Sequence, residues 1–387
     1  MKITLIASDE SSAPLYRVRL LARVLSRRFE VEVLGFHFRP ETLDPLAPRD
    51  FPYRGVPARP WPAFWQDARA LCERISGDLI YAMKPRPTSY GLALALRARR
   101  GLPVVVDVDD WEPYMVAPYS RYALKNAVYG LPHLHEPNNY WATWTTDRLV
   151  GAADAITTVS THFQRRYGGV LAPQYVDTHR FDPDRYDREA LRAEHGLSDF
   201  KVAVFAGIAQ PNKGVGEIRE ALLRLGDRAS WKLLIVGPVT PYARALAETD
   251  ERVMLLGTQP PEKTPAFLRM ADVVALPQRR EPASMGQMPM KLYEAMAMAC
   301  PVVSTAVSDI PSLLAGCGVV VAPNDPEALG EAIAGLLDDP RRAAALGEAA
   351  RRRIRERYSY EAGAATLGCL FSAVDARRRA RKGGRPC

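Results

Sequence analysis

The residues most suited to chemistry lie in two loops of the second half of the sequence. The first loop follows the apolar run 202–207, which ends at Gly207, and it passes through Gln210 to Lys213 and Gly214. Apolar residues at helical spacing come next, so the lysine should stand at a helix start, where backbone N–H groups already attract an anion. The glycine spacing matches neither the dinucleotide fingerprint nor a P-loop. The turn therefore predicts either a phosphate site or a solvated helix terminus.

The second loop follows the apolar run 272–277 and leads into an expected helix with Pro289 in its first turn. Lys291 and Glu294 are three residues apart, so they should share one face close to the positive end of this helix. The carboxylate could accept hydrogen bonds from a ribose diol while the lysine meets a diphosphate; alternatively, the two form a weak surface ion pair. The candidate ligand-binding residues here are Gly286, Gln287, Met288, Lys291 and Glu294.

The first half of the chain contains an acidic cluster at the end of the apolar run 104–109. Four acids occur within six positions, and Asp109 and Asp110 are adjacent. Oxygen ligands on a short loop could bind Mg²⁺. They could also accept hydrogen bonds from sugar or acceptor hydroxyls, or cap the segment that follows.

These loops need a scaffold of strands that end where the loops begin. Short β-branched runs alternate with segments of helical periodicity along the whole chain, which predicts an α/β protein with parallel sheets covered on both faces. Ligands bind at the carboxyl ends of strands in such sheets, and the loops described above follow strands. Strands are expected at 2–8, 30–36, 78–83, 104–109, 155–160, 202–207, 231–237, 252–258, 272–277, 301–305 and 318–322.

The strands divide between two doubly wound, Rossmann-like domains that should face each other across a central cleft. The stretch 181–200 lacks strand character, so we place the boundary there, with an N-terminal domain at 1–185 and a C-terminal domain at 186–359. The end of the chain is expected to be helical, with a final helix over 360–379.

Composition bounds the class of protein. The 387 residues are 47% hydrophobic and 25% charged, which is typical of a globular enzyme of two domains. No membrane span or secretion signal is evident, and the five cysteines lack metal-site or disulfide spacing, so a cytoplasmic location with reduced thiols is expected.

The net charge of +8 comes mostly from the end of the chain. The body is nearly balanced and the tail lacks interleaved aromatic residues, which argues against nucleic acid as a partner. The tail could bind an anionic membrane at the inner face, or it could be a solvated helix end. Its basic residues are Arg377, Arg378, Arg379, Arg381, Lys382 and Arg385.

Taken in order, these motifs resemble family 4 retaining glycosyltransferases of the GT-B fold over nearly the whole chain. The similar segments are Gly207 to Gly214, 153–160, 176–183 and 289–305, the last of which contains Glu-Ala-Met-Ala and Cys-Pro-Val-Val-Ser-Thr. The resemblance implies that the closing helix, with the residues up to 387, crosses back onto the N-terminal domain. It also implies transfer of a hexose from a nucleotide diphosphate sugar to an acceptor hydroxyl, in glycan, cell-envelope or glycolipid synthesis.

By the resemblance, Glu294 holds the ribose hydroxyls of the donor and Lys213 holds its diphosphate. The sequence departs from the family pattern where an acidic residue is usual eight positions before Glu294, because Gly286 stands there and Glu281 lies in a longer loop. An arginine usual beside the phosphate lysine is also replaced. Lys291, Arg279 or Arg280 could substitute for it, and Lys291 is favoured because its helix fixes its position. Backbone N–H groups of the loop could bind the sugar or the phosphate.

The resemblance assigns Asp109 and Asp110 to sugar or acceptor hydroxyls, with no metal and no cofactor besides the nucleotide sugar. The acceptor is expected to be a sugar, a lipid-linked molecule or another small molecule. Catalysis would rest on Lys213, Lys291 and the two aspartates. A sugar-nucleotide epimerase of the same fold, and a noncatalytic nucleotide-sugar-binding protein, are the alternatives.

Overall fold

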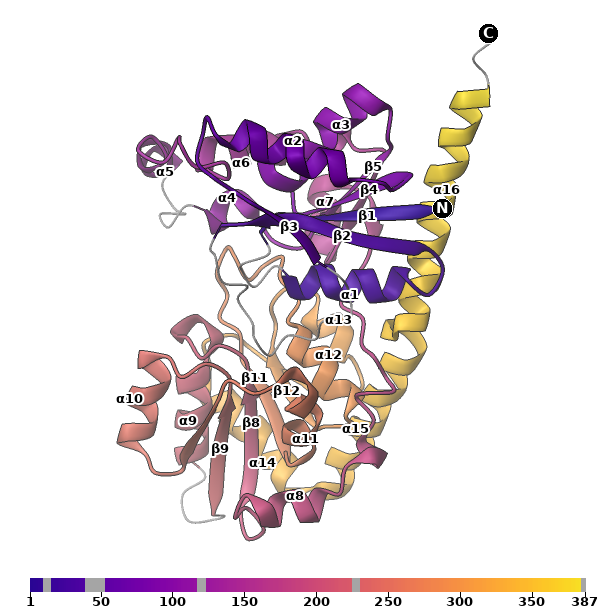
Figure 1. Ribbon diagram of the computed structural model, residues 1–387. Coiled ribbons are helices and arrows are strands. Elements are labelled where there is room, and N and C mark those ends of the chain that lie inside the picture. The colour runs from indigo at the N-terminus through magenta and orange to yellow at the C-terminus, as the bar shows by residue number, and fades with distance from the viewer. Residues whose placement is uncertain (10–14, 39–52, 117–122, 225–229, 384–387) are drawn as a thin grey trace. The chain divides into compact units, whose positions relative to one another are not determined.

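The chain forms two units, shown in the ribbon of Figure 1. The computed structural model describes residues 1–9, 15–38, 53–116, 123–224 and 230–383. Unit 1 comprises Met1–Pro173 and Tyr360–Cys387, and unit 2 comprises Gln174–Ser359.

The chain passes from unit 1 to unit 2 after Pro173, which is earlier than the boundary expected after residue 185. Residues just beyond Pro173 already bond to unit 2: the N–H of Val176 donates to the carbonyl of Tyr358 at 2.8 Å, and Gln174 Nε2 donates to the carbonyl of Met288 at 3.2 Å. The stretch 174–185 has little strand character, yet its backbone and side-chain hydrogen bonds assign it to unit 2.

Unit 1 is built on a sheet of seven parallel strands in the order β3-β2-β1-β4-β5-β6-β7. Strands β1, β4 and β5 are almost wholly buried, as expected for a sheet covered on both faces. The strands are β1 (Lys2–Ala7), β2 (Glu30–His37), β3 (Tyr53–Pro57), β4 (Leu79–Met83), β5 (Val104–Val108), β6 (Ala155–Thr158) and β7 (Val170–Leu171).

The last helix of the chain, α16 (Tyr360–Gly383), belongs to unit 1 and packs against α1 (Leu15–Leu25). Phe371 anchors it, with its ring 5.0 Å from that of Tyr81 and 6.3 Å from that of Phe29. The other helices of the unit are α2 (Phe64–Arg74), α3 (Leu92–Arg100), α4 (Glu112–Met115), α5 (Ala123–Tyr129), α6 (Tyr140–Arg148) and α7 (Thr161–Tyr167).

A buried ion pair fixes the carboxyl end of β5. Arg17 on α1 donates to both carboxylate oxygens of Asp107, at 3.0 and 3.1 Å, and Tyr81 and Thr157 donate to the same carboxylate. Asp107 is fully buried, and a buried carboxylate needs such partners to offset the loss of hydration. The residues that follow, from Asp109 on, therefore leave the sheet at a fixed point.

Unit 2 has a sheet of six parallel strands in the order β10-β9-β8-β11-β12-β13. The strands are β8 (Lys201–Ala206), β9 (Trp231–Val236), β10 (Val253–Gly257), β11 (Val273–Leu276), β12 (Val302–Thr305) and β13 (Val319–Val321).

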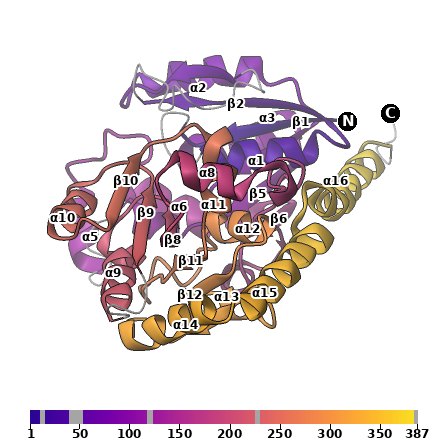
Figure 2. The same ribbon diagram turned by 90° about the horizontal axis from the view of Figure 1, so that it is seen from below.

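The helices of unit 2 cover this sheet. Helix α14 packs on α9 and on the strands β11 to β13, and α15 follows it along one side of the unit (Figure 2). The helices are α8 (Arg188–Glu194), α9 (Val215–Leu223), α10 (Pro241–Thr249), α11 (Thr264–Arg269), α12 (Met290–Ala297), α13 (Ile310–Leu314), α14 (Pro326–Asp338) and α15 (Pro340–Arg353).

All eleven predicted strands are present, and the sequence missed β3 and β7. Strand β3 lies at the sheet edge and contains a glycine and a proline, while β7 has two residues. Helix α16 continues to Gly383, beyond the predicted end at 379. It thus includes most of the basic tail, of which Arg385 lies outside the described residues. Among the described helices, none combines the length and apolar character that a membrane span needs.

Candidate functional site

The lysine of the first loop lies just before a helix rather than within it. Lys213 closes a single 3₁₀ turn, Pro211–Lys213, and Gly214 then adopts a left-handed φ of 71° before α9 begins. Lys213 is half-buried and Gln210 is exposed. Gly207 ends β8 in a conformation with φ of 144°, which strongly favours glycine. The short connection places all three residues at the carboxyl end of β8.

The two predicted loops of unit 2 are joined to each other. Strands β8 and β11 are hydrogen-bonded neighbours, so their carboxyl ends lie side by side. The N–H of Arg279 donates to the carbonyl of Asn212 at 3.1 Å. A Cβ added to Gly214 would lie 2.1 Å from the carbonyl oxygen of Pro277, which is too close for any side chain. The glycine is therefore what allows the two loops to touch.

The second loop is held by a serine in its own turn. The Ser284 hydroxyl donates to the carbonyl of Arg279 or of Glu281 and accepts from the N–H of Glu281. The N–H of Gln287, one of the predicted ligand-binding residues, donates to the carbonyl of Ser284 at 3.2 Å in this structure. The loop ends at Met288, whose side chain is buried.

Helix α12 presents the predicted lysine and carboxylate together. Lys291 Nζ and a Glu294 carboxylate oxygen are 2.8 Å apart, and the lysine side chain is 34% exposed. Leu292, Ala295 and Met296 are fully buried and anchor the opposite side of the helix. The lysine is partly exposed, whereas the Glu294 side chain is 13% exposed and the oxygen that meets the lysine is buried, so a ligand with negative charge could approach the pair from the lysine side.

Gln278 is a residue that sequence reasoning missed. It directly follows Pro277, and its side chain is 3% exposed. Its backbone carbonyl accepts a hydrogen bond from Thr305, yet neither atom of its side-chain amide has a partner among the described residues. Leaving a buried amide unpaired costs about 1–3 kcal/mol, so a ligand that bonds to it would recover that cost. The only available signal was its position directly after a strand.

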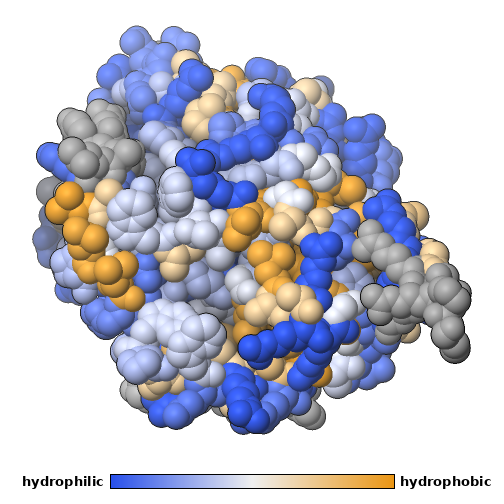
Figure 3. Space-filling model, turned by 90° about the horizontal axis from the view of Figure 1, so that it is seen from above, coloured by the Kyte–Doolittle hydropathy of each residue, from blue (hydrophilic) through white to orange (hydrophobic). Residues whose placement is uncertain are grey.

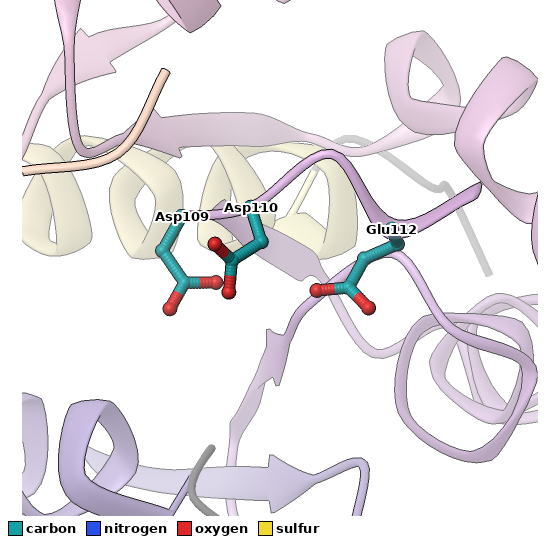
Figure 4. Close-up of side chains that lie close together, drawn as sticks. All are labelled: Asp109, Asp110 and Glu112. Carbon is teal, nitrogen blue, oxygen red and sulfur yellow. The ribbon is translucent and has the colours of Figure 1, made fainter. Parts of the chain in front are cut away.

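The acidic cluster lies in unit 1, and the structure adds a third carboxylate to the predicted pair. Figure 4 shows Asp109, Asp110 and Glu112 converging after β5. One oxygen from each lies within 4.8 Å of the others, a spacing that could hold a metal ion. The ammonium of Lys84 contacts all three, which distance in sequence made impossible to foresee. Arg86 pairs with Glu112 from the other side.

Burial raises the pKa of Asp109 to about 6, from an ordinary value of 3.8. Lys84 and Arg17 lower the pKa of this carboxyl, while the negative charges of Asp110 and Asp107 raise it. Asp109 is thus ionised at neutral pH but takes up a proton in mildly acidic solution.

Two family models match the chain, one mostly in unit 1 and the other in unit 2. Residues 14–178 match the glycosyl transferase 4-like domain, and residues 200–339 match the glycosyl transferases of group 1. The GDP-mannose-dependent alpha-(1-6)-phosphatidylinositol monomannoside mannosyltransferase of Mycolicibacterium smegmatis is 31% identical over 291 residues. That match covers 69% of this chain and 75% of the relative. The chain therefore belongs to the glycosyltransferases that combine a glycosyl transferase 4-like domain with a group 1 domain.

Of two further relatives, one has the same name as the first and one has a different name. The mannosyltransferase of the same name from Mycobacterium tuberculosis is 28% identical and covers 82% of this chain, with 88% of the relative matched. The alpha-D-kanosaminyltransferase of Streptomyces kanamyceticus is 25% identical, with 71% of each chain covered.

Solved structures give the fold of this glycosyltransferase as GT-B. Sucrose-phosphate synthase from Thermosynechococcus elongatus superimposes with a TM-score of 0.76 at 21% identity, covering 97% of this chain and 100% of that one. HepE of Anabaena, solved with UDP and glucose, has a TM-score of 0.72 at 15% identity, covering 96% of this chain and 100% of HepE.

The contact at Gly214 predicts a large effect of one methyl group. Gly214→Ala should lower the free energy of unfolding by about 1–3 kcal/mol more than Gly316→Ala, because only the first adds a clash. Gly316 is a matched control, since its φ of 73° is similar and a Cβ there would meet nothing within 4 Å. Urea denaturation measures both variants, and equal losses would show that the loops do not depend on this contact.

The raised pKa of Asp109 predicts a pH-dependent difference in stability. A carboxyl whose pKa is higher in the folded state stabilises the protein when protonated, and this contribution is lost as pH rises from about 4 through about 6. Asp109→Asn should therefore gain stability relative to the wild type between about pH 4 and pH 6, and this gain should level off above pH 6. Chemical denaturation at both pH values measures it, with the exposed Asp199→Asn as control. A constant difference would contradict the assignment.

Proposed function

We propose that this glycosyltransferase transfers a hexose, with retention of configuration, from a nucleotide diphosphate sugar to a hydroxyl of a glycolipid or another small polyol. The observation that carries the proposal is the junction of the two loops in unit 2. It groups Gly207, Gln210 and Lys213 beside the loop that leads to α12, which presents Lys291 and Glu294. These are the groups that a ribose and a diphosphate require.

The reaction breaks the bond between C1 of the sugar and the β-phosphate oxygen and forms a bond from C1 to the acceptor oxygen on the same face. The acceptor proton passes to the leaving phosphate, so the products are a glycoside and a nucleoside diphosphate. Negative charge develops on the departing phosphate, and Lys213 and Lys291 stabilise it. The half-exposed pair between Lys291 and Glu294 would open, with Glu294 turning to the ribose hydroxyls.

Unit 1 supplies the acceptor or sugar contacts in this proposal. Asp109 and Asp110 remain partly exposed, at 12% and 19% of their side chains, and would accept hydrogen bonds from hydroxyl groups. The transfer is proposed to need no metal and no further cofactor, because lysines take the role of the cation at the diphosphate.

Relatives guide the choice of substrates to test. Two of them carry names that specify GDP-mannose as donor and phosphatidylinositol monomannoside as acceptor, and another is a D-inositol 3-phosphate glycosyltransferase. GDP-mannose is accordingly the first donor to test, with these two compounds as first acceptors.

We also propose that the protein acts in the cytoplasm and contacts an anionic membrane surface. Support comes from the basic end of α16 and from apolar side chains that gather at the left of the face in Figure 3, on the side where Figure 1 draws α5. Two of the basic groups are already paired, because Arg378 and Arg379 both bond to Asp375. The exposed apolar residues on and just after α5 include Val128, Leu131 and Leu134, at 59%, 55% and 50%.

The membrane proposal predicts charge-dependent binding to vesicles. The protein should sediment with vesicles containing phosphatidylglycerol more than with pure phosphatidylcholine, and salt should weaken the interaction. Replacing both Arg377 and Arg381 by alanine should weaken binding by an order of magnitude or more, at about 1 kcal/mol for each charge. Arg341→Ala, exposed on α15, is the control. Equal sedimentation with both kinds of vesicle would refute the proposal.

The donor site predicts a selective response to sugar nucleotides. One of the GDP, UDP, ADP and dTDP sugars should raise the melting temperature, since a ligand of the folded state stabilises it. Lys213→Ala and Glu294→Ala should each abolish that rise while leaving the melting temperature without ligand almost unchanged. The controls are Arg341→Ala and Glu348→Ala, both exposed on α15. A normal response from both site variants would place the donor elsewhere.

Product analysis then separates the function from its alternatives. With donor and acceptor present, nuclear magnetic resonance should show a new glycoside with the anomeric configuration of the donor. An epimerase would convert the donor without an acceptor. A noncatalytic binding protein would respond in the thermal assay and form no product.

A further inference from the structure

Lys84 places its ammonium group among three carboxylates at the edge of the unit 1 sheet. Its Nζ lies 2.9 Å from an oxygen of Asp109, 2.5 Å from Asp110 and 2.8 Å from Glu112. The lysine side chain is 5% exposed. The ammonium donates hydrogen bonds to Asp110 and Glu112, while the nearby oxygen of Asp109 is buried and meets it through charge alone, with no hydrogen bond among the described residues. Figure 4 shows that the three carboxylates turn toward a common volume, which this ammonium reaches from the neighbouring strand end.

The backbone of Lys84 is held in a conformation that lysine rarely adopts. Its φ is 72°, in the left-handed region, which costs a residue with a Cβ about 1–2 kcal/mol. Three hydrogen bonds hold the backbone of Lys84 in this conformation. The N–H of Lys84 donates to the backbone carbonyl of Asp107, and the carbonyl of Lys84 accepts from the N–H of Arg86 and from the Ser89 hydroxyl. A glycine would adopt this φ without strain. The presence of lysine, despite the strain, indicates that its side chain has a role at this position.

The charges of the cluster favour a cation at this place. Lys84 and Arg86 bring positive charge to the three carboxylates, and the ammonium of Lys84 is the group that contacts all of them. Without the lysine, three carboxylate oxygens within 4.8 Å of one another would form a set of hard oxygen ligands for a divalent cation.

We propose that Lys84 is the built-in cation of this cluster, a positioning residue that holds Asp109 and Asp110 in place for hydroxyl binding and occupies the position of a divalent metal. The role in hydroxyl binding rests on the proposed function. Glu112 is fully buried and contacts Lys84 inside the protein, whereas the side chains of the two aspartates are partly exposed and could contact a ligand. Replacement of the ammonium by a smaller neutral group should therefore open a metal site.

Titration with Mn²⁺ tests whether a metal ion can take the place of the Lys84 ammonium. Lys84→Ala should bind one Mn²⁺ per chain at least tenfold more tightly than the wild type, measured by electron paramagnetic resonance. Mn²⁺ should also raise the melting temperature of the variant and leave that of the wild type unchanged. The double variant with Asp110→Asn should lose the response. Lys2→Ala is the matched control, because Lys2 also bridges two carboxylates, Glu30 and Glu32, at the start of β1.

The activity of the variant gives a second readout. Transfer by the wild type should be unaffected by EDTA, while transfer by Lys84→Ala should fall at least tenfold and recover in part with Mn²⁺. Metal-dependent activity of the wild type would overturn the proposal, as would a Lys84→Ala protein that neither binds Mn²⁺ nor is stabilised by it.

The stability of the variant does not limit the test. Should Lys84→Ala fail to fold alone, refolding with Mn²⁺ should recover it, and failure with and without the ion would count against the proposal. If no sugar nucleotide binds to any form of the protein, the proposed function fails, yet the Mn²⁺ titration still decides the role of Lys84.

Discussion

The arrangement of the two loops proposed to bind the donor depends on the close approach of Gly214 to the carbonyl of Pro277. Strands β8 and β11 are neighbours in a parallel sheet, and their loops leave the sheet at the same edge. The two loops can approach this closely because Gly214 has no side chain. A Cβ at this position would overlap with the carbonyl oxygen of Pro277. The lysine turn, Arg279 and the loop before α12 take their positions from this contact.

The two units use lysine in different ways, and the difference follows from burial. Lys291 is paired with Glu294, and its side chain is 34% exposed, so water screens the lysine more than it screens the glutamate. Lys84 is 5% exposed and contacts three carboxylates, so removal of its charge would leave these neighbouring negative charges closer to mutual repulsion, with little water to screen them. The first arrangement suits a group that must bind and release a substrate, and the second suits a group that keeps others in place.

Family membership and fold leave the chemistry of this chain to its particular residues. Relatives with similar folds act on different substrates, as their names record. This chain has Gly286 eight positions before Glu294, Glu281 earlier in the same loop, and a buried Gln278 whose amide has no partner among the described residues. These features lie in or beside the loop before α12, so differences in donor choice are most easily accommodated there.

The sequence by itself determined the two α/β units, the eleven principal strands and the residues on each loop. These follow from local patterns, because apolar runs mark buried strands and a lysine or carboxylate can be placed relative to its own helix. It missed β3 and β7, which lack a distinctive pattern, and it placed the first unit boundary too late. Only the tertiary structure brought Lys84 to Asp109 and Asp110, or Asn212 to Arg279, because these contacts join separate strands and depend on strand order. Spacing along the chain carries no information about which strand ends become neighbours.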